Sequence, residues 1–331
     1  MNAPVDLVDV WRGDILESRH QGHAVICGAD GEILEAWGDP QATIYPRSSC
    51  KMIQALPLVE SGAADAHGLG VEQLALSCAS HQGAHIHTDR VQVWLDSLGL
   101  ADGDFRCGPQ WPNDIPARNE IIRAHAAPCQ IHNNCSGKHA GFLTLNRHLG
   151  GDADYELVDH PVQQACKAAF EEVTGETSPG YGIDGCSAPN FATSVHGLAR
   201  AMSFFATAHD REDARSKAAV RLRDAMATFP ALVAGETRAC TELMRAMEGR
   251  VSIKTGAEGV FVAIIPEKRL GVALKIADGA TRASESAIAA ILVKLGVLDP
   301  AHPAARARME PQIRNWRGTL CGHIAPTQAL L

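Results

Sequence analysis

The sequence has few of the features that are typical of proteins that bind nucleic acids or membranes. The 331-residue chain has only 3 tyrosines and a net charge of −8 with histidine neutral, and no basic run is interleaved with aromatic residues. Single strands bind to aromatic platforms in basic grooves, and anionic membranes attract positive charge. Both are therefore disfavoured as partners. No stretch of 18 apolar residues is present, so we expect no membrane-spanning segment.

The amino-terminal residues also lack the parts of a secretory signal. The segment MNAPVDLVDVWRGD has neither a basic n-region nor an apolar h-region. No two cysteines form a C-x-x-C pair, and the ten stand at positions 27, 50, 78, 107, 129, 135, 166, 186, 240 and 321. This scatter differs from a secreted disulfide framework. We expect a cytoplasmic protein whose cysteines are mostly buried, with a few available as metal ligands.

Hydrophobic patterning predicts strands at both ends of the chain and helices between them. Short strand-like runs fill residues 5–37, and two near-continuous apolar runs, GVFVAIIP and LGVALKIA, form a late hairpin. Helices are expected at 71–77, 85–98, 117–126, 137–149, 160–174, 188–206, 209–227, 237–248 and 281–296. This order predicts an α/β fold with one antiparallel sheet between helices. We expect one unit over 1–331 with two lobes: a sheet from 1–46 and 250–331, and a mainly helical lobe at 47–249.

The first chemical motif is Ser48-Ser49-Cys50-Lys51. Residues three apart share one face of a helix, so Lys51 can take the proton of Ser48. A lysine does this only when burial or a neighbouring cation lowers its pKa, and Arg47 is adjacent. Because S-x-x-K is short, a helix cap followed by a surface lysine is the alternative.

A second motif, Lys254-Thr255-Gly256, lies on a late strand-like segment. K-T-G on a strand accompanies S-x-x-K in serine β-lactamases and penicillin-binding proteins. The order and separation of the two motifs both fit that pairing. Taken by itself, Lys254 could be an ordinary lysine on an edge strand.

Two further segments combine polar side chains with a loop-like setting. Ser80, in LSCASHQG, could relay protons or bind substrate, although serine is also common in turns. The segment from His132 to His139 fails as a phosphate loop, because it lacks the glycine and the final Ser or Thr that the loop needs. Its Cys135 could bind zinc together with Cys186, although two isolated cysteines are a weak signal.

Three histidines, His81, His85 and His87, have partial metal-site spacing. His81 and His85 are i,i+4, as in zinc-binding helices, but no glutamate stands beside them. Solvated or capping histidines are the preferred interpretation.

Together these motifs resemble the class 3, rhizobial-type L-asparaginases of the asparaginase II family. The resemblance runs from Val8 to about Thr327. It is strongest at residues 47–51, 78–81, 107–112, 132–141, 182–189 and 254–259. It implies a fold like that of serine β-lactamases and glutaminases, in a homodimer. It also implies catalytic pairs Ser48–Lys51 and Ser80–Lys254.

The resemblance further implies a zinc site and residues around the pocket. Zinc would be held by Cys135, Lys138 and Cys186 near the active site, without being strictly required for the chemistry. Asp184 would support the metal site, and the pocket would be lined or flanked by Arg47, His139 and Cys240.

The resulting hypothesis is an L-asparaginase that releases aspartate and ammonia through a lysine-activated serine. Its partner would be the small substrate, with neither nucleic acid nor membrane. A β-lactamase or penicillin-binding-type serine hydrolase is one alternative, disfavoured by the absent signal peptide and the many thiols. A zinc-binding amino-acid sensor is the other, although we see no output domain.

Overall fold

The near-continuous apolar runs of the C-terminal part form strands that are covered on both faces. All six residues of β9 (Val260–Ile265) are buried, as are most of β10 (Leu270–Ile276). The computed structural model describes residues 3–331 and divides them into two compact units. The sheet unit comprises residues 3–49, Thr193–Thr207 and Glu242–Leu331, and the helical unit comprises Cys50–Ala192 and Ala208–Thr241.

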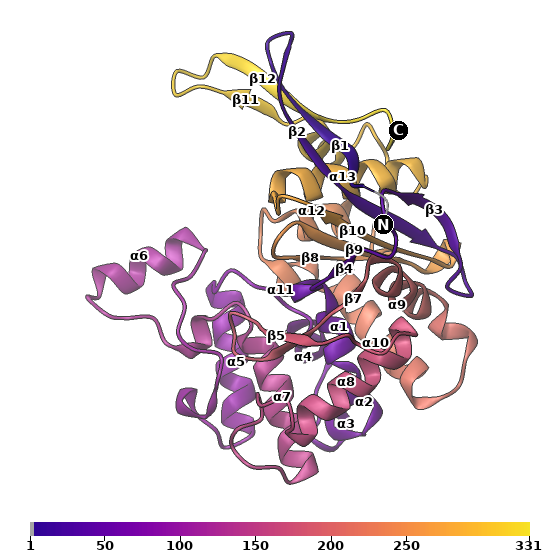
Figure 1. Ribbon diagram of the computed structural model, residues 1–331. Helices are drawn as coiled ribbons and strands as arrows, with labels where there is room; N and C mark the ends of the chain where they lie inside the picture. Colours follow the sequence, from indigo (N-terminus) through magenta and orange to yellow (C-terminus); the bar gives the residue numbers. More distant parts are fainter. Residues whose placement is uncertain (1–2) are drawn as a thin grey trace. The chain divides into compact units, whose positions relative to one another are not determined.

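The sheet unit is built on one antiparallel sheet (Figure 1). Its strand order is β11-β12-β1-β2-β10-β9-β8, and β3 also pairs with β2. The remaining strands are β1 (Val5–Arg12), β2 (Ile15–Cys27), β3 (Ile33–Trp37), β8 (Ser252–Gly256), β11 (Gln312–Arg314) and β12 (Leu320–Pro326). Strands from both ends of the chain thus share one sheet, as predicted.

Helices cover this sheet. Helix α9 (Val195–Thr207) packs on β2, β9 and β10, while α13 (Thr281–Lys294) packs on β1, β9, β10 and β12. Figure 1 shows the two helices on opposite sides of the strands. Helix α14 (Pro303–Met309), which the sequence did not predict, packs against α13. The predicted α/β class, with an antiparallel sheet between helices, is confirmed.

One predicted helix is partly wrong. Residues 188–206 were expected to be helical throughout, but the helix begins only at Val195. Before it come β6 (Pro189–Phe191), paired with β5 (Tyr181–Ile183), and β7 (Thr193–Ser194), paired with β4 (Thr43–Ile44). Pairing with distant segments overrides the local helical pattern here, and Pro189 favours an extended start.

The helical unit is organised around one buried helix. In α7 (Ser136–Leu149) every residue from Ser136 to Asn146 is buried, and the helix packs against α2, α3, α4, α5 and α8. The other helices are α1 (Lys51–Gln54), α2 (Leu56–Glu60), α3 (Ala63–Ala66), α4 (Val71–Ser77), α5 (His85–Ser97), α6 (Ile115–Arg123), α8 (Pro161–Thr174), α10 (Ala214–Thr228) and α11 (Pro230–Ala234). The lobe bounds expected at 47–249 stay a prediction, and the helical unit itself consists of Cys50–Ala192 and Ala208–Thr241.

Two elements cross the division between the units. They are η1 (Arg47–Cys50) and α12 (Ala239–Ala246). Within residues 3–331 no helix is both long enough and apolar enough to cross a membrane. The prediction of a single catalytic unit over the whole chain stays a prediction.

Candidate active site

The segment that carries Ser48 lies in the sheet unit. Ser48 is half-buried in η1, directly after Arg47. Arg47 has φ +55°, in the left-handed region that side chains other than glycine seldom adopt. The hydroxyl and the backbone N–H of Ser49 both bond the carbonyl of Pro46, at 2.7 and 3.2 Å, and so close the turn. Backbone strain of this kind gathers at functional sites because the surrounding fold must hold it in place.

Strand β8 brings the K-T-G motif against the same segment. A Cβ added to Gly256 would lie 2.6 Å from the Pro46 carbonyl and 3.1 Å from the Ser49 nitrogen. Only glycine therefore lets the end of β8 approach the backbone around Ser48 so closely. Lys254, two residues earlier, is fully buried, and its amine donates to the Thr255 carbonyl at 2.9 Å.

Lys51 and Ser80 lie in the helical unit. Lys51 begins α1 and is only 1% exposed. Its amine bonds the Ala79 carbonyl and approaches the Cys135 sulfur at 3.1 Å. Ser80 is buried directly after Ala79, and its backbone N–H donates to the Val233 carbonyl at 2.8 Å. The Lys51 amine therefore touches the loop that carries Ser80.

A buried cluster of two thiols and an amine lies at the start of α7. Lys138 and Cys186 are joined by an Nζ–Sγ contact of 3.1 Å, and the Cys135 thiol donates to the Asn134 side chain at 3.0 Å. All three predicted zinc residues are buried, and Cys186 lies in the turn between β5 and β6. Helix α7 can start here because Gly137 packs on α4, where an added Cβ would stand 2.4 Å from the Leu76 carbonyl.

The charges within this cluster are strongly coupled. The neighbouring Cys135 thiol lowers the pKa of Cys186 well below its usual range, and Lys138 adds to this effect. Cys135 correspondingly has a raised pKa and keeps its proton. Burial alone would lower the pKa of Lys138, but Cys186, Cys135 and Asp184 together outweigh burial and raise it. The pair is thus an ammonium beside a thiolate when no metal intervenes.

Three other predicted residues lie in the helical unit. His139 follows Lys138 on α7 and is fully buried, and burial lowers its pKa so that it is neutral at pH 7. Asp184 acts electrostatically on Lys138 and accepts a hydrogen bond from the N–H of Gly185 at 2.8 Å. Cys240 is buried at the start of α12.

The cluster's donors fit a soft or borderline metal ion. Among residues 3–331 no group of three or more His, Cys, Asp or Glu side chains is arranged to hold a metal. Cys135, Lys138 and Cys186 differ from such groups because the third donor is an amine. Two sulfurs and one nitrogen, all buried, are donors that suit zinc. Lys138 would have to lose its proton to bind, which a metal ion favours.

Sequence inspection missed the asparagines that hold the cluster. The Asn133 amide donates to the carbonyls of Cys107 and Gly108, and its oxygen accepts from the Cys135 N–H at 2.9 Å. Asn134 accepts the Cys135 thiol hydrogen bond. Their position directly before Cys135 was a usable signal, because short amides often bond the backbone two residues further on.

The three spaced histidines do not form a metal site. His81 and His87 are buried and stacked at 4.8 Å, and His81 bonds Ser136 Oγ at 2.9 Å. The two rings are therefore not solvated, but His81 has the expected capping role, because its Nδ1 accepts a hydrogen bond from the N–H of Gly83 at 3.1 Å. His85 is exposed and bonds Glu120.

The chain belongs to the L-asparaginase II family, whose model matches residues 8–326. Membership makes it an asparaginase-type amidohydrolase and confirms the resemblance inferred from the motifs. The narrower class 3 assignment stays a prediction. No curated protein matches the sequence.

Several solved structures have a similar backbone. One is a structure of Mglu in its tris and glutamate form, with TM-score 0.48 and 11% identity, covering 90% of this chain and 63% of that one. Another Mglu structure has TM-score 0.47 and 12% identity over 84% of this chain and 67% of that one. An octameric penicillin-binding protein homologue from Pyrococcus abyssi has TM-score 0.43 and 14% identity, covering 90% and 80%.

Proposed function

We propose that this amidohydrolase hydrolyses L-asparagine to L-aspartate and ammonia, with Ser48 as nucleophile and Lys51 as its base. The observation that supports this most directly is the packing of the K-T-G strand on the Ser48 segment, made possible by Gly256. Neither motif is specific alone, but S-x-x-K and K-T-G occur together in the serine β-lactamases and penicillin-binding proteins. The positive φ of Arg47, directly before Ser48, also supports a catalytic role for the serine, because strained backbone of this kind clusters at active sites.

The reaction starts with proton transfer from the Ser48 hydroxyl to the Lys51 amine, which acts as the base. The serine oxygen then attacks the side-chain amide carbon of asparagine, and backbone N–H groups at the start of the helical segment bind the oxyanion. The C–N bond breaks as the nitrogen takes up a proton, so ammonia leaves and an aspartyl ester remains. Water attacks the ester, and aspartate departs with the serine proton restored.

The second pair, Ser80 and Lys254, relays the proton to the leaving nitrogen in this proposal. The support is that both residues are buried and that the Lys51 amine bonds the carbonyl of Ala79, next to Ser80. A hydroxyl beside a lysine can accept and donate a proton in turn, which is what a relay requires.

We also propose a zinc ion on Cys135, Lys138 and Cys186, supported by the buried sulfur and nitrogen donors. When bound there, the metal supplies a fixed positive charge that polarises and orients the substrate. The serine–lysine pair already provides a nucleophile, so the metal is not required for the bond-breaking step. Arg47 and His139 are proposed to hold the two ends of the substrate, with Asp184 and Cys240 flanking them.

The proposal also covers the oligomeric state of the protein and its place in the cell. We propose that the chain works in the cytoplasm as a homodimer, which light scattering of the purified protein tests. Neither statement is needed for the chemistry at Ser48.

The deciding experiment measures ammonia release from L-asparagine and L-glutamine, alongside hydrolysis of a coloured cephalosporin, by the same purified protein. Release from asparagine without cephalosporin turnover is the expected result. Cephalosporin turnover without ammonia would make the chain a β-lactam hydrolase instead. Asparagine binding with no turnover of any substrate would instead indicate a sensor.

A further inference from the structure

His160, the N-cap residue of helix α8, has one ring nitrogen without a partner. The backbone N–H of Val162 donates to Nδ1 at 3.1 Å, which is the capping bond. A backbone N–H can only donate, so Nδ1 carries no proton and the ring proton is on Nε2. The residue is only 6% exposed, and its Nε2 makes no hydrogen bond to residues 3–331. The Nε2–H group is therefore a buried donor without an acceptor.

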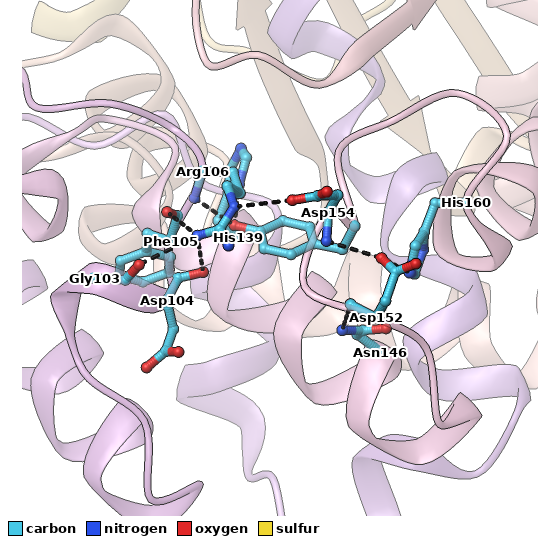
Figure 2. Close-up of polar contacts among 10 residues, drawn as sticks. Gly103, Asp104, Phe105, Arg106, His139, Asn146, Asp152, Asp154 and His160 are labelled. Atoms are coloured by element: carbon cyan, nitrogen blue, oxygen red, sulfur yellow. Dashed lines mark hydrogen bonds and ion pairs between the residues drawn. The ribbon is translucent and has the colours of Figure 1, made fainter.

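The neighbouring Asp152 carboxylate does not supply the acceptor. Its Oδ1 lies 3.6 Å from His160 Nε2, which is beyond hydrogen-bond length. The same oxygen accepts a hydrogen bond from the backbone N–H of Asp154 at 3.0 Å (Figure 2). Leaving a buried donor unpaired is unfavourable, so the ring indicates a ligand that brings an acceptor of its own.

The capping role of His160 does not account for this arrangement, as a second His-Pro pair shows. His302 precedes Pro303 and caps α14 in the same way, with its Nδ1 accepting from the Ala304 N–H at 3.1 Å. His302 is half-buried, however, and its Nε2 is not a buried atom without a partner. A histidine can therefore cap a helix without burying an unpaired Nε2–H.

His160 lines an acidic cavity of about 470 Å³ whose walls belong wholly to the helical unit. No Lys or Arg is among the described residues that line it. Glu156 Oε2 is a second buried atom without a hydrogen bond, and it is an acceptor. The carboxylates that line the cavity are Asp152, Asp154, Glu156 and Asp159, of which Asp154 is paired with Arg106 at 3.6 Å (Figure 2). An unpaired buried carboxylate oxygen among other carboxylates favours a cation.

The cavity also has an apolar wall. Leu157, Tyr181 and Ile183 line it, and they are 57%, 46% and 67% exposed. Apolar side chains gathered around a cavity with a few convergent polar groups are typical of small-molecule sites. The cavity therefore offers a ligand one hydrogen-bond donor, several carboxylates and an apolar surface.

We infer that this cavity binds a cationic amine that also carries a carbonyl oxygen and an apolar side chain, as in an amino-acid amide or the amino end of a peptide. The ammonium group faces Glu156 and the carboxylates beside it. The carbonyl oxygen accepts from His160 Nε2–H, and the apolar side chain packs on the wall that contains Tyr181. A free amino acid fits less well, because its carboxylate would be repelled by those of the cavity.

This inference does not rest on the proposed function. The described residues that line the cavity include none of those proposed for catalysis, substrate binding or zinc. The cavity is therefore proposed as a second ligand site, and it can be tested by binding alone.

The first experiment titrates the full-length protein with L-leucinamide in a calorimeter. Two analogues each lack one group: isocaproamide has no amine, and isopentylamine has no carbonyl. Each should bind at least about tenfold more weakly, because one polar contact is lost. The tripeptide amide Leu-Gly-Gly-NH₂ distinguishes the two sources of this chemistry, since tighter binding than leucinamide indicates a peptide end and weaker binding a small amide. No saturable binding of leucinamide by the folded parent overturns the inference, as does equal binding of leucinamide and both analogues.

The second experiment repeats the leucinamide titration with variants. His160→Asn keeps a good N-cap acceptor for helix α8 but has no Nε2–H, and Glu156→Gln keeps the size of the side chain without its charge. Each should bind leucinamide at least about tenfold more weakly. His302→Asn makes the same change at the other His-Pro cap and should bind it like the parent. Circular dichroism verifies folding, and if His160→Asn fails to fold, Glu156→Gln decides. Parental affinity in the folded variants overturns the inference.

Competition with asparagine distinguishes this cavity from the proposed catalytic site. The competition uses Ser48→Ala, which should not consume the asparagine, and leucinamide should bind it equally with and without excess asparagine. Displacement by asparagine, with parental leucinamide affinity in His160→Asn, would mean that the amide binds as a substrate analogue, and the inference would be wrong. If the parent binds leucinamide as expected but releases no ammonia from asparagine, the proposed activity is wrong and the second site stands.

Discussion

The candidate residues of the two units are held in place by different physical means. In the sheet unit the geometry is a property of the backbone, set by the positive φ of Arg47 and by Gly256 packed on Pro46. In the helical unit it is a property of side chains, in which thiols, an amine and amides bond one another out of contact with water. In the proposed function, the first arrangement fixes the backbone around Ser48, and the second sets the charges of the groups around Cys135 and Lys138.

This difference predicts how each region should respond to mutation. A site defined by backbone packing fails when the reacting atom is lost or displaced. A site defined by a coupled polar network loses affinity by steps, because the remaining groups redistribute protons among themselves. The predictions below are ordered by their expected effect on turnover.

The largest effect is expected from Ser48→Ala. Removing the nucleophile from a group of catalytic residues that act together should reduce kcat for asparagine by about 10⁴-fold or more. Ser61→Ala, a serine at the exposed end of α2, should keep parental activity. Ammonia release is measured for both, with circular dichroism to verify folding. Parental turnover by folded Ser48→Ala would remove the proposed nucleophile.

Substrate length gives the next largest effect. If the α-amino and α-carboxylate groups are fixed, one extra methylene moves the amide carbon of glutamine by more than about 1 Å relative to Ser48. Misplacement of this size can cost on the order of 100-fold, so asparagine should be preferred by about that factor. The test compares kcat/KM for the two amides under matched conditions. Equal values would indicate a general amidohydrolase.

Gly256→Ala tests the backbone packing of the sheet unit directly. The new Cβ would stand 2.6 Å from the Pro46 carbonyl, so β8 or the Ser48 segment must move. We expect kcat to fall by roughly 10- to 100-fold and the free energy of unfolding to fall by about 1–3 kcal/mol. Gly103→Ala is the control, because an added Cβ there meets nothing within 4 Å. Equal activities for the two variants would mean that the close approach is incidental.

Much of the fold could be predicted from the sequence because its signals are local. The runs that become β9 and β10 are apolar throughout, and helices α4 and α7 were predicted to within a residue of their bounds. The segment 188–206 was mispredicted because β6 and β7 pair with residues far away in the chain. Such pairing leaves no trace in local periodicity.

The residues of the candidate site could be predicted from the sequence only where they belong to a motif. S-x-x-K and K-T-G are short patterns with fixed spacing, and the family match covers both. Tyr155 belongs to no motif, and its contact with His139 is recognised only from the structure, where its hydroxyl bonds the Arg106 N–H and His139 Nδ1. Groups that orient other groups are recognised by geometry, so the sequence alone could not indicate them.

The smallest effect on turnover is expected from losing the metal ligands of the helical unit. We expect about one zinc per purified chain, since two sulfurs and an amine lie together at the start of α7. The double variant Cys135→Ala, Cys186→Ala should carry none, as measured by metal analysis of protein prepared without chelator. Zinc-free parental protein would contradict the site. Cys166→Ala is the matched control, a buried thiol that bonds the Gln54 carbonyl.

The two single variants distinguish the loss of a metal ligand from the loss of a partner of the proposed base, Lys51. Cys186→Ala removes a proposed metal ligand but leaves the 3.1 Å contact between Lys51 and Cys135. We therefore expect kcat to change little. KM should rise about tenfold, the effect of losing one polar contact to the substrate. Cys135→Ala also removes a partner of the Lys51 amine and should therefore lower kcat as well. If Cys186→Ala lowers kcat as strongly as Ser48→Ala, the metal takes part in the bond-breaking step. The distinction between a nucleophile held by the backbone around Ser48 and a network of thiols and an amine that only sets the charge would then be wrong.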